Sequence, residues 1–181
     1  MILAKMQKAI KFATKTHNVY QKQKRKGKDI SYITHPLTVG LILSRISADE
    51  DVICAGILHD TIEDSIPAKK VTYDLLKERF GKKVAQLVLD VTEQDKSKPW
   101  EDRKKEARQH IATFSHDSLM LKSADLASNL SELVADYKKE GDSVFLNFKA
   151  SKNKTISHAL KTIGAISKKW PANPPARHRF A

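Results

Sequence analysis

The sequence predicts an all-α fold, because apolar residues recur with the period of a helix and helix-starting and helix-ending residues flank the recurrent segments. Between residues 2 and 21, apolar side chains return every three or four positions, as on one face of a helix. Alternation of apolar and polar residues, which is typical of half-buried strands, is weak throughout the chain. We therefore expect one compact helical domain.

The first half of the chain contains signals for three helices. The first covers residues 2–21, and a basic, glycine-containing loop follows it. Pro36 suits the first turn of a second helix, because the first turn makes no use of a proline N–H. Ser47 and Glu50 have the spacing of a capping box, which predicts a third helix that carries residues 59 and 60 near its end.

The second half continues the helical pattern. Thr72 can cap a helix over residues 73–80, and Gly81 ends that helix. Further helices are predicted at 82–92, 100–114, 118–139 and 144–169, with a polar loop at 93–99. Prolines at 171, 174 and 175 oppose a helix near the end of the chain. We expect one helical domain over residues 1–169 and an extended tail over residues 170–181.

The composition narrows the classes of partner. Lys and Arg number 33 against 21 Asp and Glu, a net charge of +12 that favours polyanionic ligands. The single cysteine excludes an internal disulfide and a cysteine-based zinc cluster. No apolar run approaches the roughly 18 residues that a membrane span needs, and the N-terminal residues do not resemble a signal peptide. We expect a cytoplasmic protein without a membrane partner.

Acidic residues cluster directly after the apolar run 52–58. Neighbouring residues on a helix differ by about 100° around its axis, so His59 and Asp60 can converge on one cation. Glu63 and Asp64 follow each of them by four residues and fall along the same side. Three carboxylates crowded beside a buried segment would repel one another, and a divalent cation removes that difficulty. An exposed acidic helix end is the simpler alternative.

Two further residues complete a possible ligand set. Asp125 lies in an otherwise apolar stretch at 119–126, where an unpaired carboxylate would be costly to bury. Lys122 and Asn129 share its helix face, so a plain Asp–Lys pair is the alternative. His35 precedes Pro36 at a helix start, where a histidine can also serve as a cap or in packing.

Together His35, His59, Asp60 and Asp125 supply two imidazoles and two carboxylates. This mixed nitrogen and oxygen set suits Mn²⁺, or another divalent transition metal such as Fe²⁺ or Zn²⁺, and leaves positions for water and a substrate oxygen. The sequence therefore predicts a divalent metal site that is open to a substrate.

The order of these ligands, His…His-Asp…Asp, is the pattern by which the chain is identified as a member of the HD phosphohydrolases. The finer pattern resembles the hydrolase domain of RelA/SpoT proteins and the stand-alone small alarmone hydrolases, which include the metazoan SpoT homologue. The matching segments are Tyr-Ile-Thr-His-Pro (32–36), Leu-His-Asp-Thr-Ile-Glu-Asp-Ser (58–65), Phe-Gly (80–81), Val-Thr-Glu-Gln-Asp-Lys (91–96), Arg-Lys (103–104) and Lys-Ser-Ala-Asp-Leu-Ala-Ser-Asn-Leu (122–130).

The resemblance implies the helical HD fold, Mn²⁺ as cofactor and the same four metal ligands. It also implies removal of the 3′-pyrophosphate from (p)ppGpp, which yields GDP or GTP and pyrophosphate. Glu63 and Asp64 match the family's catalytic pair, and Asn129 matches a residue that contacts the ribose. Lys24 and Arg25 fall where the family places basic residues that hold the base and phosphates. No synthetase domain follows in the sequence, so we expect hydrolysis alone.

In the resulting mechanism, Glu63 or Asp64 exchanges protons with water and the leaving oxygen, and the sequence does not say which is acid and which is base. Basic side chains offset the phosphate charge. The candidates for this role are Lys24, Arg25, Lys96, Arg103 and Lys122.

Two alternatives stay open. NADPH, through loss of its 2′-phosphate, or another phosphorylated nucleotide is the alternative substrate. The alternative of another class is a basic module that binds nucleic acid or a protein partner and carries a vestigial HD site. Aromatic residues make up 7% of the chain and form no stacking series, so we expect a small phosphorylated nucleotide as partner in place of nucleic acid. The sequence allows an oligomer without specifying one.

Overall fold

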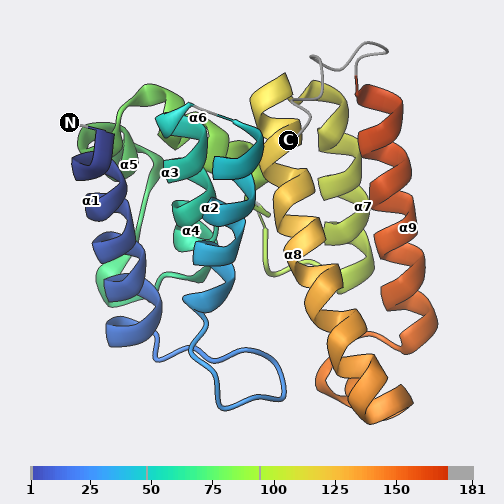
Figure 1. Ribbon diagram of the computed structural model, residues 1–181. Coiled ribbons are helices and arrows are strands. Elements are labelled where there is room, and N and C mark those ends of the chain that lie inside the picture. The colour runs from blue at the N-terminus through green and yellow to red at the C-terminus, as the bar shows by residue number, and fades with distance from the viewer. Residues whose placement is uncertain (1, 48, 94, 171–181) are drawn as a thin grey trace, which may run out of the picture.

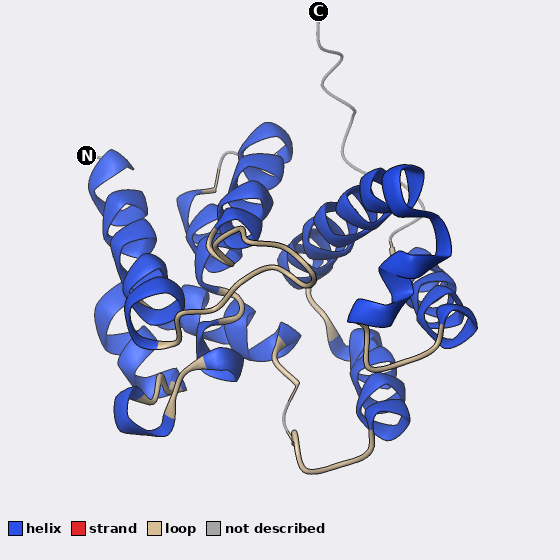
Figure 2. Ribbon diagram, turned by 90° about the horizontal axis from the view of Figure 1, so that it is seen from below, coloured by secondary structure: helices blue, strands red, loops and turns tan. Residues whose placement is uncertain are grey.

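The computed structural model describes residues 2–47, 49–93 and 95–170, and these residues form helices and loops without a β-strand (Figures 1 and 2). The helices are α1 (Ile2–Thr14), α2 (Thr34–Ile46), α3 (Glu50–Leu58), α4 (Thr61–Asp64), α5 (Tyr73–Phe80), α6 (Lys82–Val91), α7 (Trp100–His110), α8 (His116–Glu140) and α9 (Lys152–Lys169). Shorter turns are the π-helical η1 (Lys15–Tyr20) and the 3₁₀ turns η2 (Pro67–Lys69), η3 (Ile111–Thr113) and η4 (Gly141–Asn147). The all-α prediction is confirmed.

Helix α3 lies at the centre of the larger core. Residues 52–58 of this helix are all buried, and it packs against α1, α2, α6 and α8. Leu43 from α2 and Leu121 from α8 are fully buried around it. Because an apolar helix is covered on all sides, the polar residues that follow its last turn begin inside the protein.

Two glycines allow α2 and α3 to approach closely. A Cβ added at Gly40 would lie 2.7 Å from Cγ1 of Ile57, and one added at Gly56 would lie 2.4 Å from Cδ1 of Leu43. Neither position has room for a larger residue. This close contact brings the first turn of α2 beside the end of α3.

A second apolar cluster lies on the other side of the molecule, where α7, α8 and α9 lie together in Figure 1. Ile111, Phe114, Leu119 and Ile166 form this cluster. Val91 and Trp170 pack against both clusters. The predicted tail began at residue 170, but Trp170 belongs to this packing; residues 171–181 lie outside the described part of the chain.

Several predicted helix boundaries are wrong for local reasons. Asp49, not Ser47, caps α3, since its side chain accepts a hydrogen bond from the Asp51 N–H, while Ser47 ends α2. The predicted first helix becomes π-helical after Thr14. The predicted helix 144–169 is split, because η4 runs to Asn147 and α9 begins only after the Ser151 cap.

Thr72 and Gly81 act as predicted at the two ends of α5: the Thr72 side chain accepts from the Leu75 N–H, and Gly81 has a positive φ of 94°. Among the described residues, no helix combines the length and the apolar character that crossing a membrane requires.

Candidate metal centre and active site

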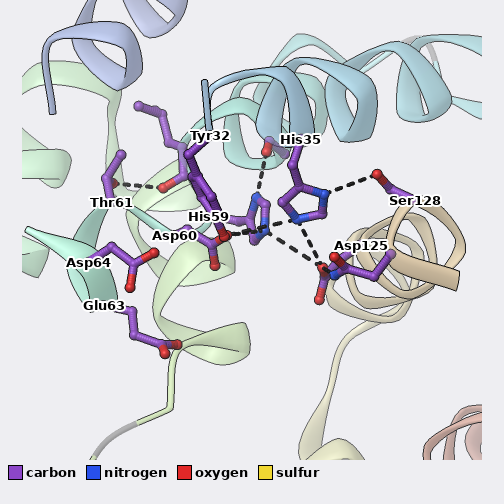
Figure 3. Close-up of polar contacts among 12 residues, drawn as sticks. Tyr32, His35, His59, Asp60, Thr61, Glu63, Asp64, Asp125 and Ser128 are labelled. Carbon is purple, nitrogen blue, oxygen red and sulfur yellow. Dashed lines mark hydrogen bonds and ion pairs between the residues drawn. The ribbon is translucent and has the colours of Figure 1, made fainter. Parts of the chain in front are cut away.

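Three predicted ligands meet where α2, α3 and α8 come together. His35 lies in the first turn of α2, His59 directly follows α3, and Asp125 lies within α8. One donor atom from each residue falls within 4.8 Å of the other two. Asp125 Oδ1 is 3.3 Å from Nε2 of His35 and 3.8 Å from Nε2 of His59. All three residues are buried. Figure 3 shows their side chains pointing toward one another.

Asp60 completes the predicted set from the other side of the two imidazoles. Its Oδ2 is 3.0 Å from Nε2 of His59 and 3.8 Å from Nε2 of His35. The hydroxyl of Tyr32 donates a hydrogen bond to the same oxygen. The structure therefore brings together all four residues that the sequence selected, although Asp125 is separated from Asp60 by 65 positions of the chain.

The histidine rings are fixed by partners on their far nitrogens. Nδ1 of His59 lies 2.8 Å from the Gly56 carbonyl, which can only accept, so this nitrogen carries the proton. Nε2 is then the ring nitrogen that faces the acids, 3.0 Å from Oδ2 of Asp60 and 3.8 Å from Oδ1 of Asp125. Nδ1 of His35 lies 3.0 Å from the Ser128 hydroxyl. Such outer partners are typical of histidines that bind metals.

The electrostatics favour a positive charge between the ligands. Burial lowers the pKa of His59, but the charge and contact of Asp60, followed by Asp125, outweigh it and raise the pKa to about 9. Burial would also raise the pKa of Asp60, yet the neighbouring His59 holds it below its ordinary value. A divalent cation in place of the Nε2 proton would meet an imidazole nitrogen and two carboxylates, a donor set that fits it.

Asp125 is held by both residues that share its helix face. Lys122 donates to Oδ2 at 2.8 Å, and Asn129 donates to Oδ1 at 2.7 Å. Burial opposes ionisation, but Lys122 and then His35 keep the pKa of Asp125 well below its usual range. The Asp–Lys pair and the contact with the histidines thus coexist. Oδ1 is the oxygen that faces the imidazoles.

Glu63 and Asp64 extend from the short helix α4 beside Asp60 (Figure 3). Asp64 accepts from Lys96 at Oδ1 (3.0 Å) and from Gln23 at Oδ2 (2.9 Å). Glu63 is held more loosely: Lys96 lies 3.5 Å from Oε1, and the Glu93 N–H lies 3.4 Å from Oε2. Burial first, and then the charge of Asp60, raise the pKa of Glu63.

The basic loop between η1 and α2 reaches across to α8. Arg25 donates from Nε to Glu132 at 2.9 Å and from Nη2 to Asn129 at 3.0 Å. Lys28 pairs with Glu132 at 2.7 Å. Burial raises the pKa of Glu132, but hydrogen bonds from Arg25 and Lys28 outweigh burial and lower the pKa to about 2. Lys24 instead pairs with Asp29 at the exposed part of the loop and makes no described contact with the metal centre.

Arg103 lies on α7 and pairs with Glu93 at 2.6 Å. Lys104, on the same helix, also pairs with Glu93. Burial raises the pKa of Glu93, but the charges of Lys104 and then Arg103 outweigh burial, so the pKa lies below its ordinary value. Glu93 thereby connects the basic side chains of α7 to the loop that touches Glu63.

Sequence reasoning missed the residues that support the site. Tyr32 was part of a recognised motif without a role, and Gln23, Ser128 and Glu132 were not selected. Gln23 lies next to the basic residues at 24 and 25, and Ser128 lies next to Asn129, so adjacency to selected residues was the available signal. Their contacts join positions as far apart as 25 and 132, which no local pattern specifies.

Residues 9–155 match the family model of the HD domain. The chain belongs to the HD-domain family. This HD domain covers α2, α3, α4 and α8, and so contains every residue of the predicted metal centre.

The HD-domain chain is similar to curated pyrophosphohydrolases. It is 38% identical over 130 residues to the guanosine-3′,5′-bis(diphosphate) 3′-pyrophosphohydrolase of Aquifex aeolicus, covering 71% of this chain and 18% of that protein. It is 36% identical over 126 residues to the enzyme of that name, MESH1, of Danio rerio, covering 68% of this chain and 66% of that protein. The chain thus spans less than two thirds of the length of these two relatives.

Solved structures share the arrangement of the HD domain. One is a metazoan orthologue of SpoT described as hydrolysing ppGpp, with a TM-score of 0.73, 25% identity and coverage of 90% of this chain and 85% of that one. Another comes from Listeria monocytogenes EGD-e, with a TM-score of 0.68, 31% identity and coverage of 77% and 86%. The resemblance to RelA/SpoT-type hydrolases is therefore confirmed.

Proposed function

We propose that this HD-domain protein is a metal-dependent phosphohydrolase that removes the 3′-pyrophosphate from (p)ppGpp and releases GDP or GTP. The observation that carries the proposal is the meeting of two imidazoles and two carboxylates beside a second carboxylate pair. The names of the similar curated proteins support the choice of substrate.

His35, His59, Asp60 and Asp125 would hold the metal, and we propose Mn²⁺ on the basis of this mixed donor set. Nε2 of His59 faces the carboxylates of both Asp60 and Asp125, so it is placed to share a cation with them. When bound, a divalent ion supplies Lewis-acid activation of water and offsets charge on phosphoryl oxygens. Tyr32 and Ser128 keep the donor side chains oriented from outside the set.

We assign the proton-exchanging role to Glu63. Burial raises its pKa, and its oxygens have long contacts that leave them available to a reacting group. Asp64 is the better candidate for orienting the attacking water, because both of its oxygens are fixed by N–H donors.

Basic groups around these acids would bind the phosphates of the substrate. Lys96 touches both Glu63 and Asp64, and Lys122 lies beside Asp125. We propose the same role for Lys24, Arg25 and Arg103. We propose that Asn129 contacts the ribose. The ion pairs refine the role of Arg25. Glu132 neutralises much of the Arg25 charge, so Arg25 is better placed to orient a nucleotide than to attract its phosphates.

We further propose that the catalytic domain extends through Trp170 and that the protein acts in the cytoplasm. These statements rest on the sequence and on the packing of Trp170.

The test is a product analysis. Purified protein is incubated with Mn²⁺ and a panel containing ppGpp, pppGpp and NADPH. We expect pyrophosphate and GDP or GTP, and loss of turnover in Glu63→Gln. Phosphate released from NADPH alone would establish the alternative substrate. Turnover of none of the panel, together with salt-sensitive RNA binding that survives His59→Ala, would contradict the enzymatic proposal and favour a nucleic-acid-binding module.

A further inference from the structure

Gln23 forms hydrogen bonds at both ends of its side chain, and each partner is important to the geometry of the site. Its Nε2 donates to Asp64 Oδ2 at 2.9 Å, and its Oε1 lies 3.0 Å from Nδ1 of His17. Because the amide NH₂ faces Asp64, the amide oxygen faces His17, and Nδ1 of His17 must carry a proton. This is the orientation of the Gln23 amide that satisfies both neighbours.

His17 provides a rigid support for that amide. It lies in the π-helical turn η1, is fully buried and packs against the Tyr32 ring at 5.1 Å between ring centroids. Burial lowers the pKa of His17 despite the opposing effects of Gln23, Asp60 and Asp64, so the ring is neutral at neutral pH. A neutral ring with its proton on Nδ1 is the form that can donate to Gln23. Single π-helical turns of this kind often occur at functional sites.

The backbone of Gln23 is fixed as well. Its N–H donates to the His17 carbonyl at 2.9 Å, and its carbonyl accepts from the Tyr32 N–H at 3.0 Å. Gln23 and Tyr32 therefore face each other at the base of the basic loop. From this base, Tyr32 donates to Asp60 while Gln23 donates to Asp64. The same loop base thus orients one acid of the metal centre and one of the catalytic pair.

We propose that Gln23 is a positioning residue that fixes the Asp64 carboxylate for hydrolysis, which rests on the function proposed above. Lys96 holds Oδ1 and Gln23 holds Oδ2, so the plane of the carboxylate is set by two donors from different segments. Without Gln23, the carboxylate retains Lys96 as a partner and can rotate about that contact. Preorganisation of this kind affects the reacting state more than the binding of substrate.

The experiment compares three variants in the full chain with Mn²⁺ and the nucleotide that the wild-type protein hydrolyses. Gln23→Leu removes both polar atoms at nearly constant volume, and Gln23→Glu keeps the shape but places a carboxylate against Asp64. Gln21→Leu is the matched control, because Gln21 is exposed two residues earlier. Thermal unfolding of each variant verifies that it is folded. For each, kcat and KM are measured as a function of pH.

We expect Gln23→Leu to lower kcat by about 10- to 100-fold with KM unchanged, because misplacing a catalytic group by about 1 Å can cost about 100-fold in rate. Gln23→Glu should move the acidic limb of the kcat profile to higher pH, because two adjacent carboxylates do not both ionise readily. Gln21→Leu should match the wild-type protein. Wild-type kcat and pH profiles in both Gln23 variants would overturn the inference while leaving the proposed hydrolase intact.

An activity-independent readout separates the two proposals. In ¹⁵N NMR spectra, the Gln23 side-chain amide should show a hydrogen-bonded proton that is lost or shifted in Asp64→Ala. If the wild-type protein hydrolyses no nucleotide, the proposed function fails, and the NMR result alone decides the Gln23–Asp64 contact. An unchanged Gln23 amide resonance in Asp64→Ala would overturn it.

Discussion

Ser128 should control the metal affinity of His35 without touching the metal. Its hydroxyl lies 3.0 Å from Nδ1 of His35, and the two residues are 6% and 3% exposed. In Ser128→Ala the helix is preserved and the lost volume is that of one oxygen atom. The main consequence is a buried imidazole nitrogen without a partner, because water has little access to replace the hydroxyl.

The size of the effect follows from this burial. Leaving a buried polar group without its hydrogen bond costs about 1–3 kcal/mol, so the free energy of unfolding of the metal-free protein should fall by that amount. Loss of an outer partner of a metal-binding histidine typically lowers metal affinity by about 10- to 100-fold. At about 1.4 kcal/mol per tenfold change, this adds roughly 1.4–2.8 kcal/mol to the loss when Mn²⁺ is saturating for the wild-type protein.

The assay combines urea unfolding without metal and calorimetric titration with Mn²⁺. Ser131→Ala is the control, because Ser131 lies on the same helix α8 and is exposed. We expect the control to change stability by a few tenths of a kcal/mol and to leave Mn²⁺ affinity unchanged. A Ser128→Ala protein that binds Mn²⁺ as tightly as wild type would refute the assignment of Ser128 as the partner that orients a ligand.

Further predictions concern packing and titration. Gly40→Ala should lower the free energy of unfolding by about 1–2 kcal/mol, because overpacking exceeds the gain in helix propensity. Gly164→Ala, with nothing within 4 Å of the new Cβ, should raise it by about 0.5–1 kcal/mol. If urea unfolding shifts the stability of both variants in the same direction, the close α2–α3 contact is contradicted. Burial and then Lys104 lower the pKa of His158 from 6.5 to about 4. Between these two pH values the unfolded chain binds a proton at His158 that the folded protein does not, so the free energy of unfolding should fall as pH decreases from 6.5 to 4. His158→Asn should make the free energy of unfolding depend less on pH in this range. A pKa of His158 near 6.5 in an NMR titration would contradict the burial of its ring. Glu63→Gln should lower kcat more than it raises KM in a steady-state assay; equal turnover would exclude Glu63 from proton exchange.

The sequence was sufficient for the fold class because the relevant signals are local. Thr72 and Gly81 end their helix by properties of their own side chain and backbone, and both predictions are confirmed. The break between Asn147 and Ser151 was missed, since the apolar residues on both sides continue a helical period. A serine cap without a following acid gave too weak a local signal.

Some residues of the candidate site could likewise be predicted from the sequence, and others could not. Asp125 could be selected because a carboxylate in an apolar stretch needs a partner, and the structure places it 3.3 Å from His35. Nothing in the sequence around Gln23 or Ser128 indicates that either side chain needs a particular partner. Their importance arises from contacts with Asp64 and His35, which are 41 and 93 positions away. Such contacts depend on the packing of whole helices and are visible only in three dimensions.

The most direct test of the metal centre is a crystal structure of the protein grown with Mn²⁺ and measured at the manganese absorption edge. We predict one strong anomalous peak bounded by Nε2 of His35, Nε2 of His59, Asp60 and Oδ1 of Asp125, and its disappearance in His59→Ala. A well-ordered site without a peak, or a manganese ion bound elsewhere with these four residues unchanged, would contradict the account.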